Sequence, residues 1–291
     1  MMPTMKKSLV FMVVACCTLF ASAKAAVVPE SWKSTPLHFK TEAQMRPDIQ
    51  RYAKDARMTY YLILRAYNIG TLKSAVLTYY KLMESKPSDP YLRAAFAFSH
   101  FMATEYHFDR WPKPDADLNM IEAGVDASRD MSVRMLSGNS AILLMAARAQ
   151  FFSNAVGVAE AIPEMRKGLS WGQKAVAKDR RWAESHYWLA RMWHYFAMNN
   201  IKASKAQKAS WNRLAFSSSQ NALRLGGKPF EAPCYLDFSY YYIGTEQWRA
   251  ALKYLDMATA LLPNNHINRR DFAATRKALL EAINNQQRSD R

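Results

Sequence analysis

The chain has 291 residues, of which 50% are hydrophobic and 13% aromatic, so it can bury a substantial core and a mainly disordered protein is excluded. Only nine glycines occur, and their scarcity in a chain rich in alanine and methionine favours helices over strands. The formal net charge of +16 at pH 7 favours anionic partners over cationic ones.

The N-terminus has the organisation of a secretory signal peptide. Two lysines precede an apolar run over Ser8–Ala21, and Ala23-Lys24-Ala25 follows as a small-x-small cleavage site. The run is shorter than the ~20 residues that a membrane-spanning helix needs. We therefore expect residues 1–25 to be removed on export, most readily to a bacterial periplasm.

A second way of processing the N-terminus stays open. Val13-Val14-Ala15-Cys16 loosely resembles a bacterial lipobox, and cleavage there would leave a lipidated Cys16. Apolar sequence continues to Phe20, which favours cleavage after Ala25 instead. In that case Cys234 is the one remaining cysteine, so no internal disulfide can form and stability comes from packing.

From Thr41 onward, apolar residues recur with a period of 3.6, and no alternating strand or hairpin signal interrupts them. The breaks are short and rich in Gly, Pro, Asn and Asp. At one of them, Ser88 or Asp89 is expected to cap a helix that begins at Pro90. Apolar segments joined by such short breaks predict antiparallel helix pairs.

One spacing pattern occurs more than once. In the stretch EQWRAALKYLDMATALLPNN, Ala251 and Ala258 lie two helical turns apart, and Pro263 ends the helix. The stretch GTLKSAVLTYYKLMESKP repeats its spacings: Leu72, Ala75, Tyr79 and Pro87 match Trp248, Ala251, Leu255 and Pro263. Less regular copies follow Gly168 and Trp211, and a degenerate one lies at 115–131.

These spacings resemble the tetratricopeptide repeat (TPR), a helix pair that stacks on its neighbours. The resemblance covers about Tyr60 to Pro263, although Leu82 stands where the motif has a small residue. It implies an all-α, right-handed superhelical solenoid of about five antiparallel helix pairs with a C-terminal capping helix. An unrelated all-helical bundle is the alternative.

The predicted organisation has four parts. They are a signal peptide over 1–25, a flexible lead over 26–40, a TPR-like repeat domain over 41–286 and a frayed tail over 287–291. The capping helix is placed at Asn268–Asn285. The residues expected on its inward face are Phe272, Ala273, Leu279, Leu280 and Ile283.

No catalytic motif emerges from the sequence, so we expect no enzyme, no cofactor and no metal site. His186 and His194 share a helix face but lie eight residues apart, about 12 Å along the axis, which is too far for one metal ion. Cys234 is expected to be packed, and Asp126 and Asp130 to lie on a solvated helix face.

The remaining candidate is a binding surface. The resemblance implies that the first helix of each pair lines a concave surface. The partner-binding residues predicted there are Tyr187, Arg191, His194, Tyr195, Tyr240 and Phe98. Arg191 is the sharpest candidate, because a charge one turn from Tyr187 and Tyr195 is hard to bury unpaired. Glu184 lies on the same helix.

The function that follows is a non-enzymatic, exported scaffold or adaptor that binds a peptide or protein, possibly an acidic one, in envelope assembly, transport or secretion. The alternative is a basic protein that binds an anionic cell-wall polymer or lipid headgroup. An enzyme with an unrecognised site is a further rival, and nucleic acid is not expected as a partner after export. The sequence leaves open on which face the basic residues lie.

Overall fold

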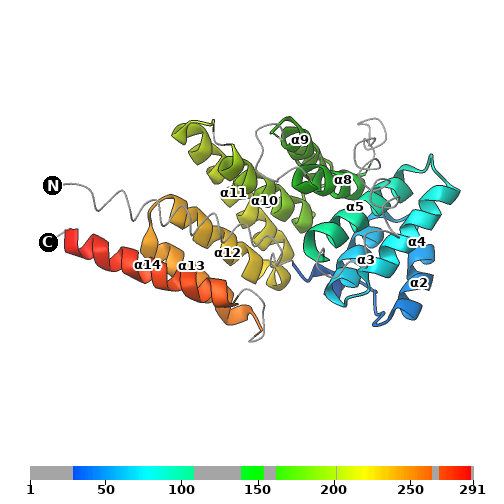
Figure 1. The fold of residues 1–291 in the computed structure, drawn as a ribbon, viewed down its shortest axis with the longest axis horizontal. Coiled ribbons are helices and arrows are strands. Elements are labelled where there is room, and N and C mark those ends of the chain that lie inside the picture. Colours follow the sequence, from blue (N-terminus) through cyan, green and yellow to red (C-terminus); the bar gives the residue numbers. More distant parts are fainter. Residues whose placement is uncertain (1–28, 108–138, 154–161, 201, 264–268, 290–291) are drawn as a thin grey trace. The chain divides into compact units, whose positions relative to one another are not determined.

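The computed structural model describes residues 29–107, 139–153, 162–200, 202–263 and 269–289. Within them it contains eleven α-helices, one short 3-10 helix and no strand (Figure 1). The all-α prediction is confirmed. The contacts separate the predicted repeat domain into two compact units, one holding Glu30–Gly226 and the other the helices after Gly227. The predicted signal peptide, Cys16, Asp126, Asp130 and the copy at 115–131 lie outside the described residues.

The first unit begins with a 3-10 helix and continues with eight α-helices in its described part. Their bounds are η2 Ser31–Ser34, α2 Glu42–Arg51, α3 Ala56–Asn68, α4 Leu72–Ser85, α5 Pro90–His107, α8 Ser140–Ser153, α9 Ile162–Lys178, α10 Ala183–Asn199 and α11 Lys205–Gly226. Helices that follow one another pack together in α4–α5, α8–α9 and α10–α11, as antiparallel pairs require.

Residues 30–40 pack against α3, so the expectation of a flexible lead is wrong for them. Leu37 and Phe39 are 2% and 3% exposed. The Arg65 side chain of α3 holds this segment, because its Nε donates to the backbone oxygen of Phe39 (2.6 Å) and its guanidinium lies 4.5 Å from the centre of the Trp32 ring. Non-periodic aromatic residues give no helical signal, yet they bury well against a neighbouring helix.

Local capping chemistry places the helix starts. The Asp55 carboxylate accepts the backbone N–H groups of Arg57 and Met58 at the start of α3, both at 3.0 Å. Asp89 accepts the N–H of Tyr91 (2.9 Å) at the start of α5, which confirms the predicted cap.

Close approach of α8 and α9 depends on Gly168. A Cβ atom at this position would lie 2.7 Å from both the Cβ and the backbone nitrogen of Phe151, a separation that packed atoms do not adopt. A Cβ atom at Gly172, one turn later, would lie 3.0 Å from the sulfur of Met192 in α10. Both glycines belong to the predicted repeat copy, in which they occupy small packing positions.

The second unit consists of three helices in its described part: α12 Lys228–Gly244, α13 Trp248–Leu261 and α14 Arg269–Ser289. Ala251, Leu255 and Ala258 are at most 1% exposed, so the predicted buried face of α13 is confirmed. Leu236, Leu262, Phe272 and Leu279 complete this core.

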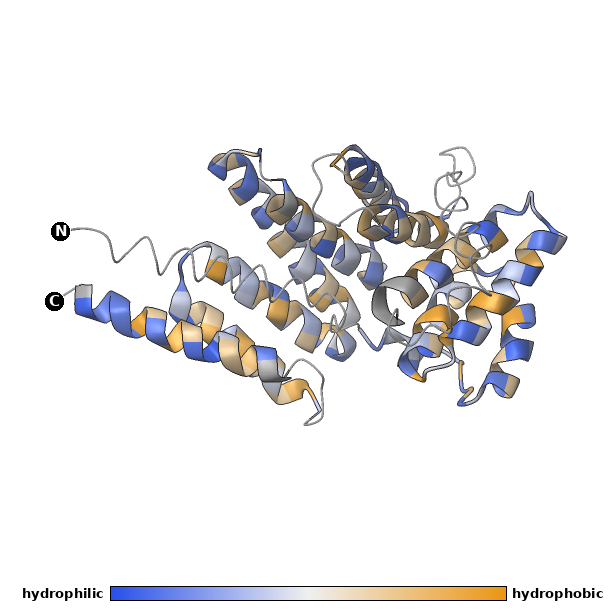
Figure 2. Cartoon of the chain, in the orientation of Figure 1, coloured by the Kyte–Doolittle hydropathy of each residue, from blue (hydrophilic) through white to orange (hydrophobic). Residues whose placement is uncertain are grey.

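The capping helix α14 differs from its prediction in two respects. Phe272 and Leu279 face the core, but Leu280 is 38% exposed and Ala273 is also exposed. Thr275 takes the buried position between them instead, so the buried stripe is narrower than predicted. Figure 2 shows hydrophilic and hydrophobic residues alternating along this helix. The helix also continues to Ser289, into the stretch expected to fray.

Candidate functional site

Four of the six predicted binding residues lie on α10, and three of them are buried. Tyr187 is 1% exposed, and Arg191 and Tyr195 are each 8% exposed. His194 is partly exposed, although its Nε2 atom is buried. In this conformation, therefore, His194 is the residue of the four that reaches the surface most.

The Arg191 guanidinium lies against an aromatic ring, 5.6 Å from the centre of Tyr195. Tyr195 in turn meets Phe152 edge-on, with ring centres 5.5 Å apart. The sequence singles out Arg191 because burying an unpaired charge is costly, and this ring is one of the contacts that lower that cost.

Phe98 and Tyr240 lie on other helices. Phe98 of α5 is fully buried and stacks on Tyr60, with ring centres 5.4 Å apart. Tyr240 of α12 is partly exposed and belongs to the second unit. The structure thus brings four of the six residues together on one helix and assigns the other two to separate helices.

A buried arginine on α8, which the sequence analysis missed, connects Phe98 to α10. The Arg148 guanidinium lies 3.4 Å from the centre of the Trp188 ring and 4.5 Å from that of Phe98. Its Nη1 donates to the Tyr60 hydroxyl (3.1 Å), and its Nη2 lies 3.2 Å from the Met102 sulfur. The side chain is 0% exposed. The signal in the sequence was a single charge inside the apolar run AILLMAARAQF.

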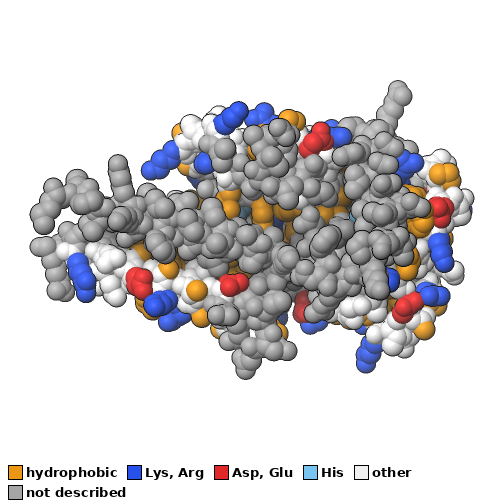
Figure 3. All heavy atoms as spheres, in the orientation of Figure 1, with side chains coloured by type: hydrophobic (Ala, Val, Ile, Leu, Met, Phe, Trp, Pro, Cys, Tyr) orange, Lys and Arg blue, Asp and Glu red, His pale blue; other side chains and the backbone are white. Residues whose placement is uncertain are grey.

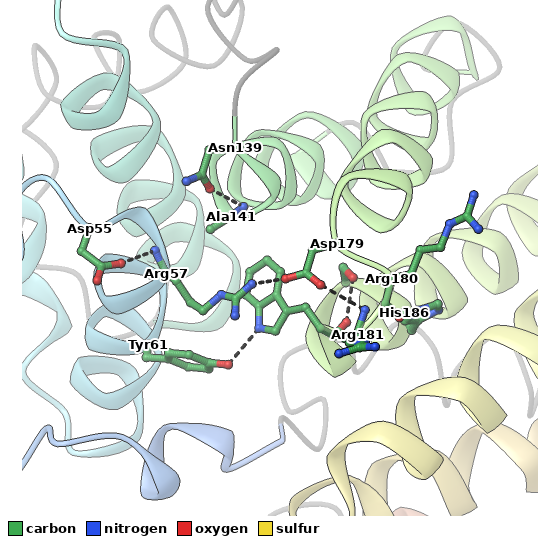
Figure 4. Close-up of polar contacts among 11 residues, drawn as sticks. Asp55, Arg57, Tyr61, Asn139, Ala141, Asp179, Arg180, Arg181 and His186 are labelled. Carbon is green, nitrogen blue, oxygen red and sulfur yellow. Dashed lines mark hydrogen bonds and ion pairs between the residues drawn. The ribbon is translucent and has the colours of Figure 1, made fainter.

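Charged and aromatic residues join α3 to the turn between α9 and α10, as Figure 4 shows for Arg57 and Asp179. Arg57 and Asp179 form an ion pair. The same guanidinium lies 4.9 Å from the centre of the Trp182 ring, whose Nε1 donates to the Tyr61 hydroxyl (2.8 Å). Residues more than 120 positions apart in sequence are therefore held together here.

Glu184 lies buried beside this junction, 2% exposed. Burial raises the pKa of its carboxyl group, and the nearby Ser31 and Tyr61 hydroxyls and the Arg57 charge only partly oppose that rise. Burial likewise raises the pKa of the Tyr60 hydroxyl, against the effect of the Arg148 charge. The first turn of α10 thus carries a carboxyl group that its surroundings favour in the neutral form.

The described part of the chain groups no three His, Cys, Asp or Glu side chains that could hold a metal ion. Cys234 is buried in the second unit, as predicted. His186 bonds through Nε2 with the backbone oxygen of Arg180 (3.0 Å). Among the described helices, none has the length and apolar character needed to cross a membrane.

Comparison with solved structures identifies the fold. The chain aligns with a thermophilic TPR protein from Thermus thermophilus at a TM-score of 0.51 and 14% identity, covering 77% of this chain and 99% of that one. A second alignment, with MamA, has a TM-score of 0.42 and 14% identity and covers 68% and 92% of the two chains. No protein-family model matches the sequence, and the curated proteins give no match. The TPR-like solenoid fold predicted from the repeats is confirmed.

Proposed function

We propose that this chain is an exported, non-enzymatic scaffold that binds a peptide or protein on the surface formed by the first helices of its pairs. An accessory role in envelope assembly, transport or secretion suits such a scaffold. The support is the TPR-like fold, which is aligned over 77% of the chain. Stacked helix pairs of this kind present extended surfaces for partners.

The location that we propose for the site rests on the way side-chain exposure increases from the first half of α10 to the second. Its first half is buried, whereas Trp193, His194 and Met198 in its second half are partly exposed. Tryptophan and methionine are enriched at binding interfaces, and tryptophan is among the residues that contribute most to binding energy. We place the principal contact there, with Arg191 and Tyr195 supporting it from below and Tyr240 as a separate contact on α12.

The test is affinity capture of tagged full-length protein from an extract of its own cells, comparing wild type with Trp193→Ala and His194→Ala. Tyr80→Ala is the matched control, since Tyr80 is also a partly exposed aromatic residue on a helix of the same unit. Circular dichroism melts verify that each variant is folded. A discrete protein that is lost with Trp193→Ala and kept with Tyr80→Ala supports the site. Equal retention by all variants rejects it.

The formal net charge of +16 favours a second candidate function, the binding of an anionic cell-wall polymer or lipid headgroup. The two candidates respond differently to salt. Binding carried by charge alone falls steeply as the salt concentration rises, whereas contacts made by a buried aromatic anchor are much less sensitive. Repeating the capture across a salt series therefore distinguishes them.

A further inference from the structure

Acidic residues are missing from the part of the chain that contains α11. No Asp or Glu occurs between Glu184 and Glu231, whereas α11 alone carries Lys205, Lys208, Arg213 and Arg224. The two acids just before this stretch are already engaged, because Asp179 pairs with Arg57 and Glu184 is buried. The positive charge of α11 is therefore not neutralised by nearby acids in the sequence.

These basic side chains lie at the surface. Lys202, Lys205, Arg213 and Arg224 are exposed and Lys208 is partly exposed; together they are named the basic α11 surface. Within the described ranges none of the five forms an ion pair, and Arg224 donates to the Asn221 amide oxygen (3.3 Å). Figure 3 shows Lys and Arg side chains gathered over the region of α11.

Helix stability does not account for the lysines. The start of a helix favours negative charge, but α11 has no acid in its first turn and begins with Lys205, closely followed by Lys208. The helix start is held instead by reciprocal hydrogen bonds between Ser204 and Gln207, at 2.9 and 3.2 Å. The first turn of α11 therefore goes against the usual preference of helix starts for acidic residues, and departures of this kind are typical of functional positions.

Several of the side chains between the charges are small, and the larger Trp211 and Phe216 are only partly exposed. Ala206, Ala209, Ser210 and Ser217 are exposed on the same helix, so a partner can approach the backbone closely. Leu214, at 44% exposed, is the one large hydrophobic side chain that is well exposed on α11, whereas Trp211, Phe216, Leu223 and Leu225 are only partly exposed. Insertion into a lipid surface calls for several apolar or aromatic side chains. The surface therefore suits an extended chain better than a bilayer.

We propose that the basic α11 surface binds an extended acidic segment of a partner protein, with carboxylates paired to Lys205, Arg213 and Arg224. At 1.5 Å of rise per residue, Lys205 and Arg213 lie roughly 12 Å apart along the helix axis, and Arg213 and Arg224 roughly 16 Å. An extended peptide spans such distances in about four or five residues. The segment therefore carries one acid in about every four or five residues.

The experiment measures fluorescence anisotropy of a labelled peptide of about 14 residues, with glutamate at every fourth position, added to the full-length protein. The test variant is the triple substitution Lys205→Gln, Arg213→Gln and Arg224→Gln. The matched control is Lys73→Gln, Lys81→Gln and Lys86→Gln, which removes three exposed lysines on and beside α4. Both variants lose the same charge, so a general field effect is equal in the two.

We expect the α11 triple variant to bind the peptide about tenfold more weakly than wild type, and the α4 variant less than twofold, since each exposed ion pair contributes modestly. A peptide with glutamine in place of glutamate should not bind. Equal losses in the two variants would overturn the proposal. The proposal would also be overturned if the wild type did not bind the peptide but bound anionic lipid vesicles, and the α11 substitutions abolished that vesicle binding. Neither result bears on Trp193 and His194, so the α10 site is judged separately.

Discussion

Glu184 lies buried at the start of α10, where its surroundings oppose ionisation. Among the described residues, its Oε1 atom has no hydrogen-bond partner. Replacing the carboxylate by the neutral isostere in Glu184→Gln should therefore raise the free energy of unfolding at pH 7 by about 1 kcal/mol. Because the folded pKa is raised, the wild type gains stability as the pH falls through it, so the difference should shrink in acid.

Urea unfolding of the two proteins at pH 7 and pH 4.5 checks this expectation. A less stable Glu184→Gln protein at pH 7 would mean that the ionised carboxylate is favourable, through Arg57 or another group. Glu30→Gln, an exposed acid, serves as the control and should change little.

Two histidines, His100 and His194, should make the stability of the fold sensitive to acid. Burial lowers the pKa of His100 to about 4, and burial together with the nearby Arg191 charge lowers that of His194 to about 4. The unfolded values are near 6.5, so the unfolded state binds more protons between about pH 6.5 and 4. Stability should therefore fall as the pH falls through this window, by about 1.4 kcal/mol per pH unit for each histidine.

Thermal melts from pH 7 to about pH 3 test this expectation in the wild type and in His100→Gln and His194→Gln. Each substitution should flatten the decline in that window. The decline below pH 4, where carboxylates such as Asp179 with its lowered pKa become protonated, should remain. An unchanged slope in both variants would show that the histidines titrate normally.

The residues of the site were partly accessible from sequence. Tyr187, Arg191, His194 and Tyr195 were found because helical spacing puts residues seven or eight apart on one face. Their exposure was not accessible, because burial depends on which helices pack against that face. Arg148 was missed since a lone charge in an apolar run has no spacing to reveal it, and its partners Tyr60 and Trp188 come from distant helices.

At the scale of the element, the contact between α8 and α9 should be the least tolerant of added volume. Gly168→Ala places a Cβ 2.7 Å from the Phe151 backbone, which cannot move without shifting a helix. We expect a loss of about 1–3 kcal/mol in the free energy of unfolding. Gly172→Ala meets the flexible Met192 side chain instead and should cost less.

Chemical denaturation of both glycine variants gives the comparison. Equal costs would indicate that the helices separate freely, or that alanine helix propensity dominates at both positions.

Helices were predictable to the extent that short breaks bounded them. Ala251, Leu255 and Ala258 gave the buried face of α13, because small and large residues alternate there at helical spacing. The face of α14 was predicted less well: a polar residue, Thr275, is buried, and Leu280 is exposed. Which side chains of α14 are buried depends on where α13 packs against it, and the spacing of apolar residues in the sequence does not give that position.

At the scale of the whole molecule, two units with separate cores should unfold in two steps. The unit after Gly227 has three described helices and a small core, so it should unfold first. Leu255→Ala and Leu64→Ala should each lower the free energy of unfolding of the unit that contains the residue by about 2–5 kcal/mol. In a calorimetric scan, Leu255→Ala should therefore lower the midpoint temperature of the first transition, and Leu64→Ala that of the second. Both side chains are at most 1% exposed, which makes the pair a matched test.

One cooperative transition, shifted by either substitution, would show instead that the two units unfold together. The boundary between the two units lies at Gly227, whose φ of +62° is in the region that favours glycine.

The junction of Arg57 and Tyr61 with Asp179 and Trp182 has a consequence for how this chain can evolve. In an array where each repeat touches only its neighbours, a pair of helices can be gained or lost at little cost. Here the chain between α3 and α9 is a closed loop fixed at both ends by this junction. A helix pair added to the packed helices inside this loop would have to leave Arg57 beside Asp179 and Tyr61 beside Trp182, a constraint that does not apply to the part of the chain that follows α10.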